Sequence, residues 1–454
     1  MNKLRVIIQE VQHIASLTLE LNLEDPGLHC LVGRNGVGKT TLVRALRNLS
    51  TADTFIKTAP PRIFRQGSSI SYDLDGTEFL FTYDAALRTL NCRTTIPEEV
   101  RDMISAELPI PHGARFNYAR SASSADDEIR KSIALESYVR PDELIAFLAA
   151  VYETDRYSGL IEVRAKAQSF YAIANSDGTY IREDYLSSGE HFLINLYRTI
   201  KSNARLIVID EIDLSLDAAA QVKISAWLRT FCATYTCKIL FTTHSLAVMK
   251  TLYPTELFYL EASDVATTIA PVSYSYIKAR LFGFQGWDRY ILTEDRVLQG
   301  LIVHLLAHHC PPSFYSCKII YIGGATQVVD LLRRNLDEQF LAAGHNAIAI
   351  LDGDQKHTPQ AAYPSVHLLP IESVEKDLYS RRHSDAAFPF HYARQTFSGD
   401  KDFFNYLQQT NVATLTEIYE YLVYSHKVEF EDLVGSLTSF LSLQHSVEAT
   451  PVAA

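Results

Sequence analysis

Hydrophobic and polar residues alternate along the first thirty residues, which is typical of antiparallel strands. Two alternating runs, at residues 5–8 and 17–21, lead through an Asp25-Pro26-Gly27 turn into a short apolar strand. Two further alternating runs between Ser69 and Tyr83 surround Asp75-Gly76, which is a strong hairpin signal. The pattern therefore predicts antiparallel hairpins joined to a parallel core.

The pattern becomes helical between about residues 97 and 180, where Pro141-Asp142-Glu143 has the form of a proline-led first helical turn. We expect a helical subdomain inserted here, and the lack of sustained heptads excludes a long coiled-coil arm. A fully apolar run at residues 206–209 and the stretch 238–243, which is apolar at 239–241, then predict buried strands of a parallel sheet.

An α/β rhythm restarts after a connection that contains Pro271. Strands are predicted at residues 290–293, 318–322, 347–351 and 366–369, with helices between them, and the last seventy residues have a helical pattern. The predicted fold class is α/β. Its expected parts are a first domain at residues 1–270, a linker at 271–285, a second α/β domain at 286–385 and a helical C-terminal region at 386–454.

Length and composition agree with several globular domains. The chain has 454 residues, 47% of them hydrophobic, and no uninterrupted apolar run long enough to cross a membrane. Its six cysteines show no C-x-x-C spacing, so neither a disulfide framework nor a zinc site is indicated. We therefore expect a soluble cytoplasmic protein with no membrane partner. The formal charge of −11 argues against a broad nucleic-acid-coating surface and leaves local basic grooves open.

The first chemical motif stands between the apolar strand and a helix. Gly33, Gly38, Lys39 and Thr40 fill the fixed positions of G-x-x-x-x-G-K-[ST], a loop whose backbone N–H groups wrap a triphosphate. Lysine at this position reaches the β and γ phosphates, and the threonine hydroxyl binds Mg²⁺. We therefore expect ATP and Mg²⁺ as cofactors. The predicted cofactor-binding residues of the loop are Gly33, Asn35, Gly36, Gly38, Lys39, Thr40 and Thr41.

Three further signals follow in order. Ser187-Ser188-Gly189-Glu190 precedes an apolar helix and, taken alone, is typical of a helix N-cap. The apolar run 206–209 ends in Asp210-Glu211, as a metal site at the carboxyl edge of a parallel strand requires. The strand at 238–243 ends in His244, and a lone histidine is usually structural.

These motifs, in this order, resemble the ATP-binding-cassette ATPases, specifically the soluble branch with the SMC and RecF-like proteins. The resemblance implies that Lys39 and Thr40 hold phosphate and Mg²⁺, that Asp210 orders Mg²⁺, that Glu211 polarises the attacking water and that His244 senses the γ-phosphate. It also implies that Ser187, Ser188 and Gly189 contact the nucleotide of an opposite subunit, hence a homodimer or a higher even oligomer. Gln66 is a candidate for the family's Q-loop glutamine, although no motif supports it.

In the second half, acidic residues follow the predicted strands. Glu294 follows one strand, and Asp352-Gly353-Asp354 follows another, with a Gly323-Gly324 turn between. An isolated DGD is more typical of a turn. Together the residues resemble the Toprim domain, which implies that Glu294, Asp352 and Asp354 bind Mg²⁺ and act in catalysis. Glu372 and Glu375, expected on one face of a helix, are additional candidate ligands. The family glutamate is usually followed by glycine, whereas this chain reads Thr-Glu-Asp-Arg.

An ABC-type ATPase followed by a Toprim domain resembles the overcoming-lysogenization-defect (OLD) nucleases, many of which act in bacterial phage defence. The resemblance implies an ATP-controlled, Mg²⁺-dependent nuclease acting on nucleic acid. A second hypothesis is an ATPase sensor or DNA-repair clamp whose degenerate Toprim domain binds a partner protein. The sequence leaves open whether DNA or RNA is cut, what triggers activity and which partner protein is involved.

Overall fold

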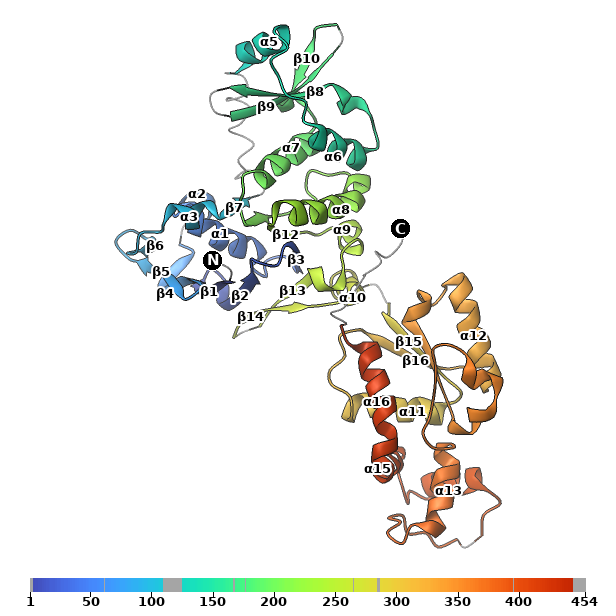
Figure 1. Cartoon of the computed structure of the whole chain (residues 1–454). Coiled ribbons are helices and arrows are strands. Elements are labelled where there is room, and N and C mark those ends of the chain that lie inside the picture. The colour runs from blue at the N-terminus through green and yellow to red at the C-terminus, as the bar shows by residue number, and fades with distance from the viewer. Residues whose placement is uncertain are drawn as a thin grey trace. The chain divides into compact units, whose positions relative to one another are not determined.

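The computed structural model describes residues 3–60, 62–108, 125–165, 168–175, 177–263, 265–283, 286–394 and 396–443. The chain divides into two compact units, the first extending to Ile277 and the second beginning at Lys278 (Figure 1). This division lies within helix α10 (Tyr274–Phe282), so a helix occupies most of the predicted linker 271–285. None of the helices in these ranges is both long and apolar enough to cross a membrane.

Unit 1 is built on a mixed sheet whose described strands run in the order β6-β5-β4-β1-β2-β14-β13-β3-β12-β11-β7. The strands from β13 to β7 pair in parallel, and β1, β2, β4, β5 and β6 form antiparallel hairpins. The central strands are β3 (Gly27–Gly33), β11 (Leu206–Ile209), β12 (Lys238–Thr242) and β7 (Ile104–Glu107). Every residue of β11 and β12 is buried, as their apolar residues predict, and this includes Lys238 and Thr242 at the two ends of β12.

The other elements of unit 1 surround this core. Its remaining strands are β1 (Lys3–Val11), β2 (Ile14–Asn22), β4 (Phe64–Leu74), β5 (Thr77–Asp84), β6 (Thr89–Cys92), β13 (Leu257–Ala262) and β14 (Thr267–Pro271). Its helices outside the insertion are α1 (Lys39–Ser50), α2 (Thr54–Thr58), α3 (Glu98–Asp102), α7 (Ser188–Ile200), α8 (Ala218–Tyr235) and α9 (Leu246–Lys250). Leu42 and Leu46 of α1 belong to the same buried cluster as Val208 and Leu240 of the sheet, which fixes α1 against the central strands.

Residues 97–180 do not form the helical insertion that the sequence predicts, because α3 packs into the main core and β7 belongs to the central sheet. The inserted segment after β7 is not purely helical either. It contains α5 (Asp126–Ala134) and α6 (Asp142–Tyr152), but also an antiparallel sheet of β8 (Leu160–Ala165), β9 (Gln168–Ala174) and β10 (Tyr180–Arg182). Ile161, Val163 and Ala165 alternate inward from β8 onto a small core of their own. These strands are too short for their period-two pattern to be distinguished from a helical pattern in the sequence. Figure 1 shows α7 and α8 between this sheet and the central strands.

The described strands of unit 2 form one all-parallel sheet in the order β16-β15-β17-β18, with helices on both faces. The strands are β15 (Arg289–Thr293), β16 (Cys317–Tyr321), β17 (Ala347–Leu351) and β18 (Val366–Leu368). In β17, Ile348 and Ile350 pack into the core that includes α11, whereas Ala349 and Leu351 pack into the core that includes α12. Alternation along one buried strand therefore supplies two cores.

The helices of unit 2 are α11 (Arg296–His308), α12 (Ala325–Glu338), α13 (Val374–Ser384), α14 (Asp400–Gln409), α15 (Leu415–Ser425) and α16 (Lys427–Leu441). The last three occupy the predicted helical C-terminal region up to Leu441. Residues 444–454 of that region lie outside the described residues. Ile418, Leu422, Leu433 and Leu437 of these helices are buried in the core that contains Ile291 of β15.

Gly353 provides a test of the packing beneath the acidic segment of unit 2. A Cβ atom on Gly353 would meet the carbonyl oxygen of Ile371 and lie 2.6 Å from that of Leu369, and both are backbone atoms. Gly353→Ala should therefore lower the free energy of unfolding by about 1–3 kcal/mol, the usual cost of overpacking. Gly399→Ala is the matched control, because nothing lies within 4 Å of its added Cβ. Scanning calorimetry of the full chain measures both, and equal midpoints for the two variants would contradict the packing.

Candidate functional site

The loop between β3 and α1 depends on its glycines. A Cβ atom on Gly33 would lie 2.8 Å from the carbonyl oxygen of Leu260 on β13, so only glycine fits without moving backbone. Gly36 and Gly38 have φ angles of 79° and 110°, in the left-handed region that favours glycine. Gly38 also gives α1 an N-cap with no side-chain hydrogen bond. The first N–H groups of α1 therefore point to the loop and are available to an anion.

Lys39 begins α1 and turns back over this loop. Its Nζ donates to the carbonyl oxygens of Gly33, at 2.8 Å, and Arg34, at 3.2 Å, and the residue is buried. Burial lowers the pKa of Lys39, while the carboxylates of Asp210 and Glu211 oppose that shift. The ammonium group is thus held by backbone carbonyls beside two acidic residues.

The two threonines after Lys39 lie in different surroundings. Thr41 is buried, and its hydroxyl donates to Oε1 of Gln12 at 2.8 Å. Thr40 is only half-buried at the first turn of α1, as a hydroxyl that reaches a metal requires. Gln12 lies in the turn between β1 and β2 with a φ of 58°. Sequence reasoning missed this residue because it belongs to no motif.

Asp210 and Glu211 follow β11 and are organised by Thr242 at the end of the neighbouring strand β12. The Thr242 hydroxyl donates to Oδ1 of Asp210 at 2.6 Å and accepts from the backbone N–H of Glu211 at 2.8 Å. The carbonyl of Thr242 also accepts from Ile212 N–H at 3.0 Å. Glu211 has a φ of 54°, unusual for a residue other than glycine, and these bonds hold it there.

The residues around Asp210 fit a magnesium ion. Among the described residues, Oδ2 of Asp210 is a buried oxygen without a hydrogen-bond partner, and the charge of Lys39, the residue before Thr40, interacts with the Asp210 carboxylate. A lone carboxylate oxygen with a nearby hydroxyl is the donor set that Mg²⁺ uses beside nucleotide phosphates. Burial raises the pKa of Glu211, and the carboxylates of Asp210 and Asp213 raise it further, so Glu211 is a better proton acceptor than a free carboxylate.

His244 is placed by Asp213, another residue that belongs to no predicted motif. Oδ1 of Asp213 accepts from the Thr243 hydroxyl at 2.6 Å and from the His244 backbone N–H at 3.3 Å. The His244 side chain remains exposed, and burial together with Lys39 lowers its pKa. The loop after β11 and the loop after β12 are therefore joined by one carboxylate.

The Ser187–Glu190 segment caps α7. Ser187 is the N-cap, and Glu190 completes a capping box through its Oε2, 2.8 Å from Ser187 N. The other oxygen of Glu190 accepts from Tyr157 at 2.5 Å and pairs with Arg156. Ser188 remains exposed at the helix start.

Gly189 lies against the loop that follows β11. A Cβ atom on Gly189 would lie 2.7 Å from the carbonyl oxygen of Ser215. Gly189 therefore links the start of α7 to the loop that begins at Glu211. By contrast, Gln66 is exposed on β4, in the antiparallel part of the sheet.

In unit 2, Glu294 and Asp352 follow the neighbouring parallel strands β15 and β17. The backbone N–H of Asp352 donates to Oε1 of Glu294 at 2.9 Å, so the two residues adjoin at one sheet edge. Burial raises the pKa of Asp352 to about 8, and the carboxylates of Glu294 and Asp295 add to this shift. Burial also raises the pKa of Glu294. Burial and mutual repulsion therefore disfavour the charged forms of these carboxyl groups at this edge.

Asp354 does not join them as a free carboxylate. Its Oδ2 pairs with Lys376 Nζ at 2.6 Å, and its Oδ1 accepts from Gln355 at 2.8 Å. Across the described ranges, no group of three or more His, Cys, Asp or Glu side chains is arranged to hold a metal ion. As they stand, the three predicted ligands therefore do not form a complete metal cage.

The two additional candidates do not share a helix face, contrary to prediction. Glu372 precedes the N-cap Ser373 of α13 and is exposed, and its carbonyl accepts from Asp354 N at 3.1 Å. Glu375 is buried in the first turn of α13, and this burial raises its pKa. The helix begins later than the sequence pattern indicated, because Ser373 caps it by accepting from Lys376 N.

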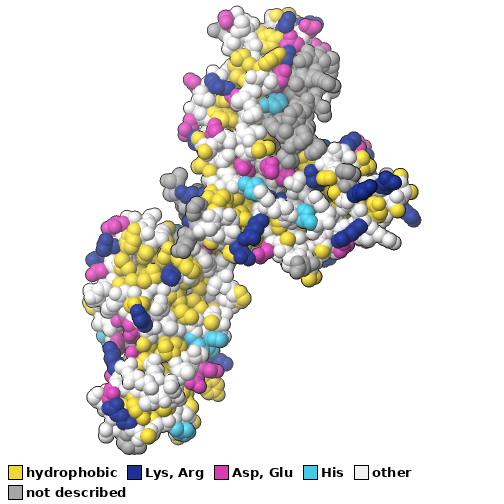
Figure 2. All heavy atoms as spheres, turned by 180° about the vertical axis from the view of Figure 1, so that it is seen from behind, with side chains coloured by type: hydrophobic (Ala, Val, Ile, Leu, Met, Phe, Trp, Pro, Cys, Tyr) yellow, Lys and Arg dark blue, Asp and Glu magenta, His cyan; other side chains and the backbone are white. Residues whose placement is uncertain are grey.

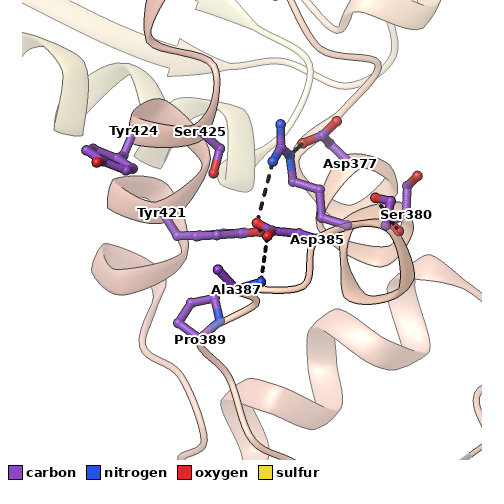
Figure 3. Close-up of a pocket in the computed structure, with 10 residues that line it drawn as sticks. Asp377, Ser380, Asp385, Ala387, Pro389, Tyr421, Tyr424 and Ser425 are labelled. Atoms are coloured by element: carbon purple, nitrogen blue, oxygen red, sulfur yellow. Dashed lines mark hydrogen bonds and ion pairs between the residues drawn. The ribbon is translucent and has the colours of Figure 1, made fainter.

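Unit 2 also contains two hollows. One, of about 730 Å³, adjoins Asp354, Lys376 and Glu372. The other, of about 720 Å³, lies between α13 and α15 (Figure 3). In the second hollow, Asp385 accepts from the Tyr421 hydroxyl, and its Oδ2 lies 3.8 Å from Nη1 of Arg381. The charges of Asp385 and Arg381 therefore compensate each other. On the face shown in Figure 2, acidic, basic and hydrophobic side chains are interspersed in both units.

Comparison with known proteins bears on unit 1. The family model described as "AAA domain, putative AbiEii toxin, Type IV TA system" matches residues 102–250, which include Ser188, Asp210, Glu211 and His244. No curated protein matches. Together with the P-loop geometry, the family match identifies unit 1 as an α/β domain of the P-loop ATPase type.

Solved structures of SMC head domains show some similarity to the chain. The head domain from Thermotoga maritima is 14% identical, with 60% of this chain and 100% of that chain covered and a TM-score of 0.36. A head domain bound to the C-terminal domain of ScpA, derived from Pyrococcus furiosus, is 11% identical, with 62% and 98% covered and a TM-score of 0.38. These TM-scores are too low for any inference about this chain.

Thr242 provides a test of the geometry around Asp210. Thr242→Val keeps the shape but removes the hydroxyl, so Asp210 and Glu211 lose their shared partner. We expect ATP turnover to fall by about tenfold or more, because a hydrogen bond to a charged group contributes about 1.5–3 kcal/mol. Thr242→Ser, which retains the hydroxyl, should stay close to the parent rate. A steady-state phosphate-release assay measures both, and equal losses in the two variants would assign the effect to packing.

Proposed function

We propose that unit 1 binds and hydrolyses ATP. The convergence of Lys39, Asp210 and Glu211 at one edge of the parallel sheet carries this proposal. In it, the N–H groups of the loop and Lys39 bind the phosphates, and Thr40 and Asp210 hold Mg²⁺, which supplies neutralisation of phosphate charge. Glu211, with its raised pKa, accepts a proton from the attacking water. His244, placed by Asp213, faces the γ-phosphate.

We further propose that the active form is a homodimer or a higher even oligomer. Ser188 is exposed at the N-terminus of α7, where Ser187 already caps the helix. An exposed hydroxyl and helix N-terminus suit the γ-phosphate of a second subunit. Two copies would then enclose two ATP molecules, with Ser187, Ser188 and Gly189 completing each site in trans.

For unit 2 we propose a Toprim-like, Mg²⁺-dependent endonuclease acting on DNA or RNA and controlled by the ATPase. The proposal assigns the ATPase to residues 1–270, the Toprim-like domain to 286–385 and the C-terminal helices to 386–454. It is supported by the Glu294–Asp352 contact at the carboxyl edge of parallel strands and by the mutual repulsion of the carboxyl groups there. Together the two activities would suit an OLD-like cytoplasmic protein of bacterial antiviral defence, and the family description names a toxin.

A second candidate function is an ATPase sensor or repair clamp in which unit 2 binds a partner protein. Two observations favour it. Asp354 is paired with Lys376, and the described residues contain no assembled three-ligand metal group. Cleavage assays with Mg²⁺ and Mn²⁺ separate the two candidates.

Glu211→Gln tests the ATPase and the dimer. The amide keeps the size of the side chain but accepts a proton poorly, so hydrolysis should fall by about a hundredfold to ten-thousandfold. ATP binding should remain nearly unchanged, and the ATP-bound variant should have the mass of a dimer by light scattering. Lys39→Ala, which lacks the phosphate-binding ammonium, is the non-binding control. Turnover at the parent rate would remove Glu211 from the proposed role.

Asp352→Asn and Glu294→Ala test the nuclease. Each should abolish cleavage of plasmid DNA or tRNA, because the two carboxylates share one sheet edge. Their ATPase rates should stay within about twofold of the parent, since the two sites belong to separate units. Asp330→Ala, an exposed acid on α12, is the control. Cleavage that survives Asp352→Asn would place the nuclease elsewhere, and a parent protein that cuts no substrate would favour the sensor.

A further inference from the structure

The Asp354 carboxylate has both of its oxygens occupied. Oδ2 lies 2.6 Å from Nζ of Lys376, and Oδ1 accepts from Nε2 of Gln355 at 2.8 Å. Among the described residues, neither Glu294 nor Asp352 forms such an ion pair with a lysine or arginine, and Oε1 of Glu294 accepts from the backbone N–H of Asp352. One lysine therefore engages the outermost acid of the group and leaves the inner pair uncompensated.

The position of Lys376 on its helix is unfavourable in itself. It lies in the first turn of α13, three residues after the N-cap Ser373. Cations are disfavoured at a helix N-terminus, where the macrodipole is positive. The contact with Asp354 offsets this cost, and Asp354 is the main cause of the raised pKa of Lys376. Lysine at this position is thus explained by its partner and not by the helix.

The pair is also easy to separate. The Lys376 side chain is 43% exposed and that of Asp354 is 30% exposed, and exposed ion pairs contribute little to stability. The hollow of about 730 Å³ beside the pair gives the lysine room to move, and the exposed Glu372 lies on its wall. Displacement of Lys376 therefore requires no rearrangement of the core.

We propose that Lys376 and a divalent cation compete for the Asp354 carboxylate, so that the lysine blocks the acidic site of unit 2 until the cation displaces it. The proposal rests on the proposed function of unit 2 to the extent that Glu294, Asp352 and Asp354 are taken as metal ligands. It explains why Glu294, Asp352 and Asp354 form no complete metal group within the described part of the chain.

The test measures Mn²⁺ binding to the full chain without nucleotide or nucleic acid, using the electron paramagnetic resonance signal of free Mn²⁺. The relevant site is the one lost in Asp352→Asn. Lys376→Met should bind Mn²⁺ about two- to fivefold more tightly than the parent, the range expected for an exposed ion pair. Lys376→Arg, which can keep the pair, should bind like the parent. Lys356→Met removes the same charge from the wall of the same hollow and should change affinity less than Lys376→Met.

Each outcome decides the proposal. Parent-like affinity in Lys376→Met would overturn it, and so would equal tightening in Lys356→Met, which would indicate a general charge effect. Mn²⁺ binding that is unchanged in Asp352→Asn would show that this edge holds no cation. Because the measurement contains no substrate, a chain that binds Mn²⁺ as expected but cuts nothing would contradict the nuclease alone.

Discussion

The hydroxyl of Thr242 is the contact on which the geometry of the ATP site depends. It joins the ends of two neighbouring parallel strands by donating to Asp210 and accepting from the backbone of Glu211. Thr242 occupies only one oxygen of Asp210. The other oxygen is buried and has no hydrogen-bond partner among the described residues, so it is available to a cation. The same contact holds Glu211 in a left-handed backbone conformation that a free chain would rarely adopt. A single hydroxyl thus contacts two consecutive acidic residues and fixes their positions.

In both units the same topological rule places acidic residues at one edge of the sheet, but the contacts of these residues differ. Parallel strands end at a common edge, so residues distant in sequence become neighbours there. In unit 1 the rule brings Asp210 beside the loop that carries Lys39, and in unit 2 it brings Asp352 beside Glu294. The difference lies beyond the strand ends. Asp210 is oriented by a neutral hydroxyl that leaves an oxygen available, whereas Asp354 is engaged by a cation from its own unit.

The sequence predicted the elements that carry a strong local pattern. The apolar runs became β11 and β12, the Asp75-Gly76 signal became the turn between β4 and β5, and the four later runs became the strands of unit 2. It did not predict the sheet β8–β10, because such short alternating strands resemble helical segments when read singly. The sequence also did not predict the contacts of Gln12, Asp213 and Thr242. Their roles come from contacts across 29 to 32 residues, which no local motif encodes.

A lysine stands beside the carboxylates in each unit, and the acceptor that it uses determines what those carboxylates can do. Lys39 donates to the backbone carbonyls of Gly33 and Arg34, so its charge stays next to Asp210 and Glu211 without occupying their oxygens. In that arrangement the Lys39 ammonium group and the carboxylates of Asp210 and Glu211 do not pair with one another. The ammonium group can therefore bind phosphate while the carboxylates bind a metal ion. Lys376 donates directly to Asp354, so the lysine and the carboxylate neutralise each other in this contact. The lysine of unit 1 therefore leaves the neighbouring carboxylate oxygens accessible, whereas the lysine of unit 2 occupies an oxygen of its neighbouring carboxylate.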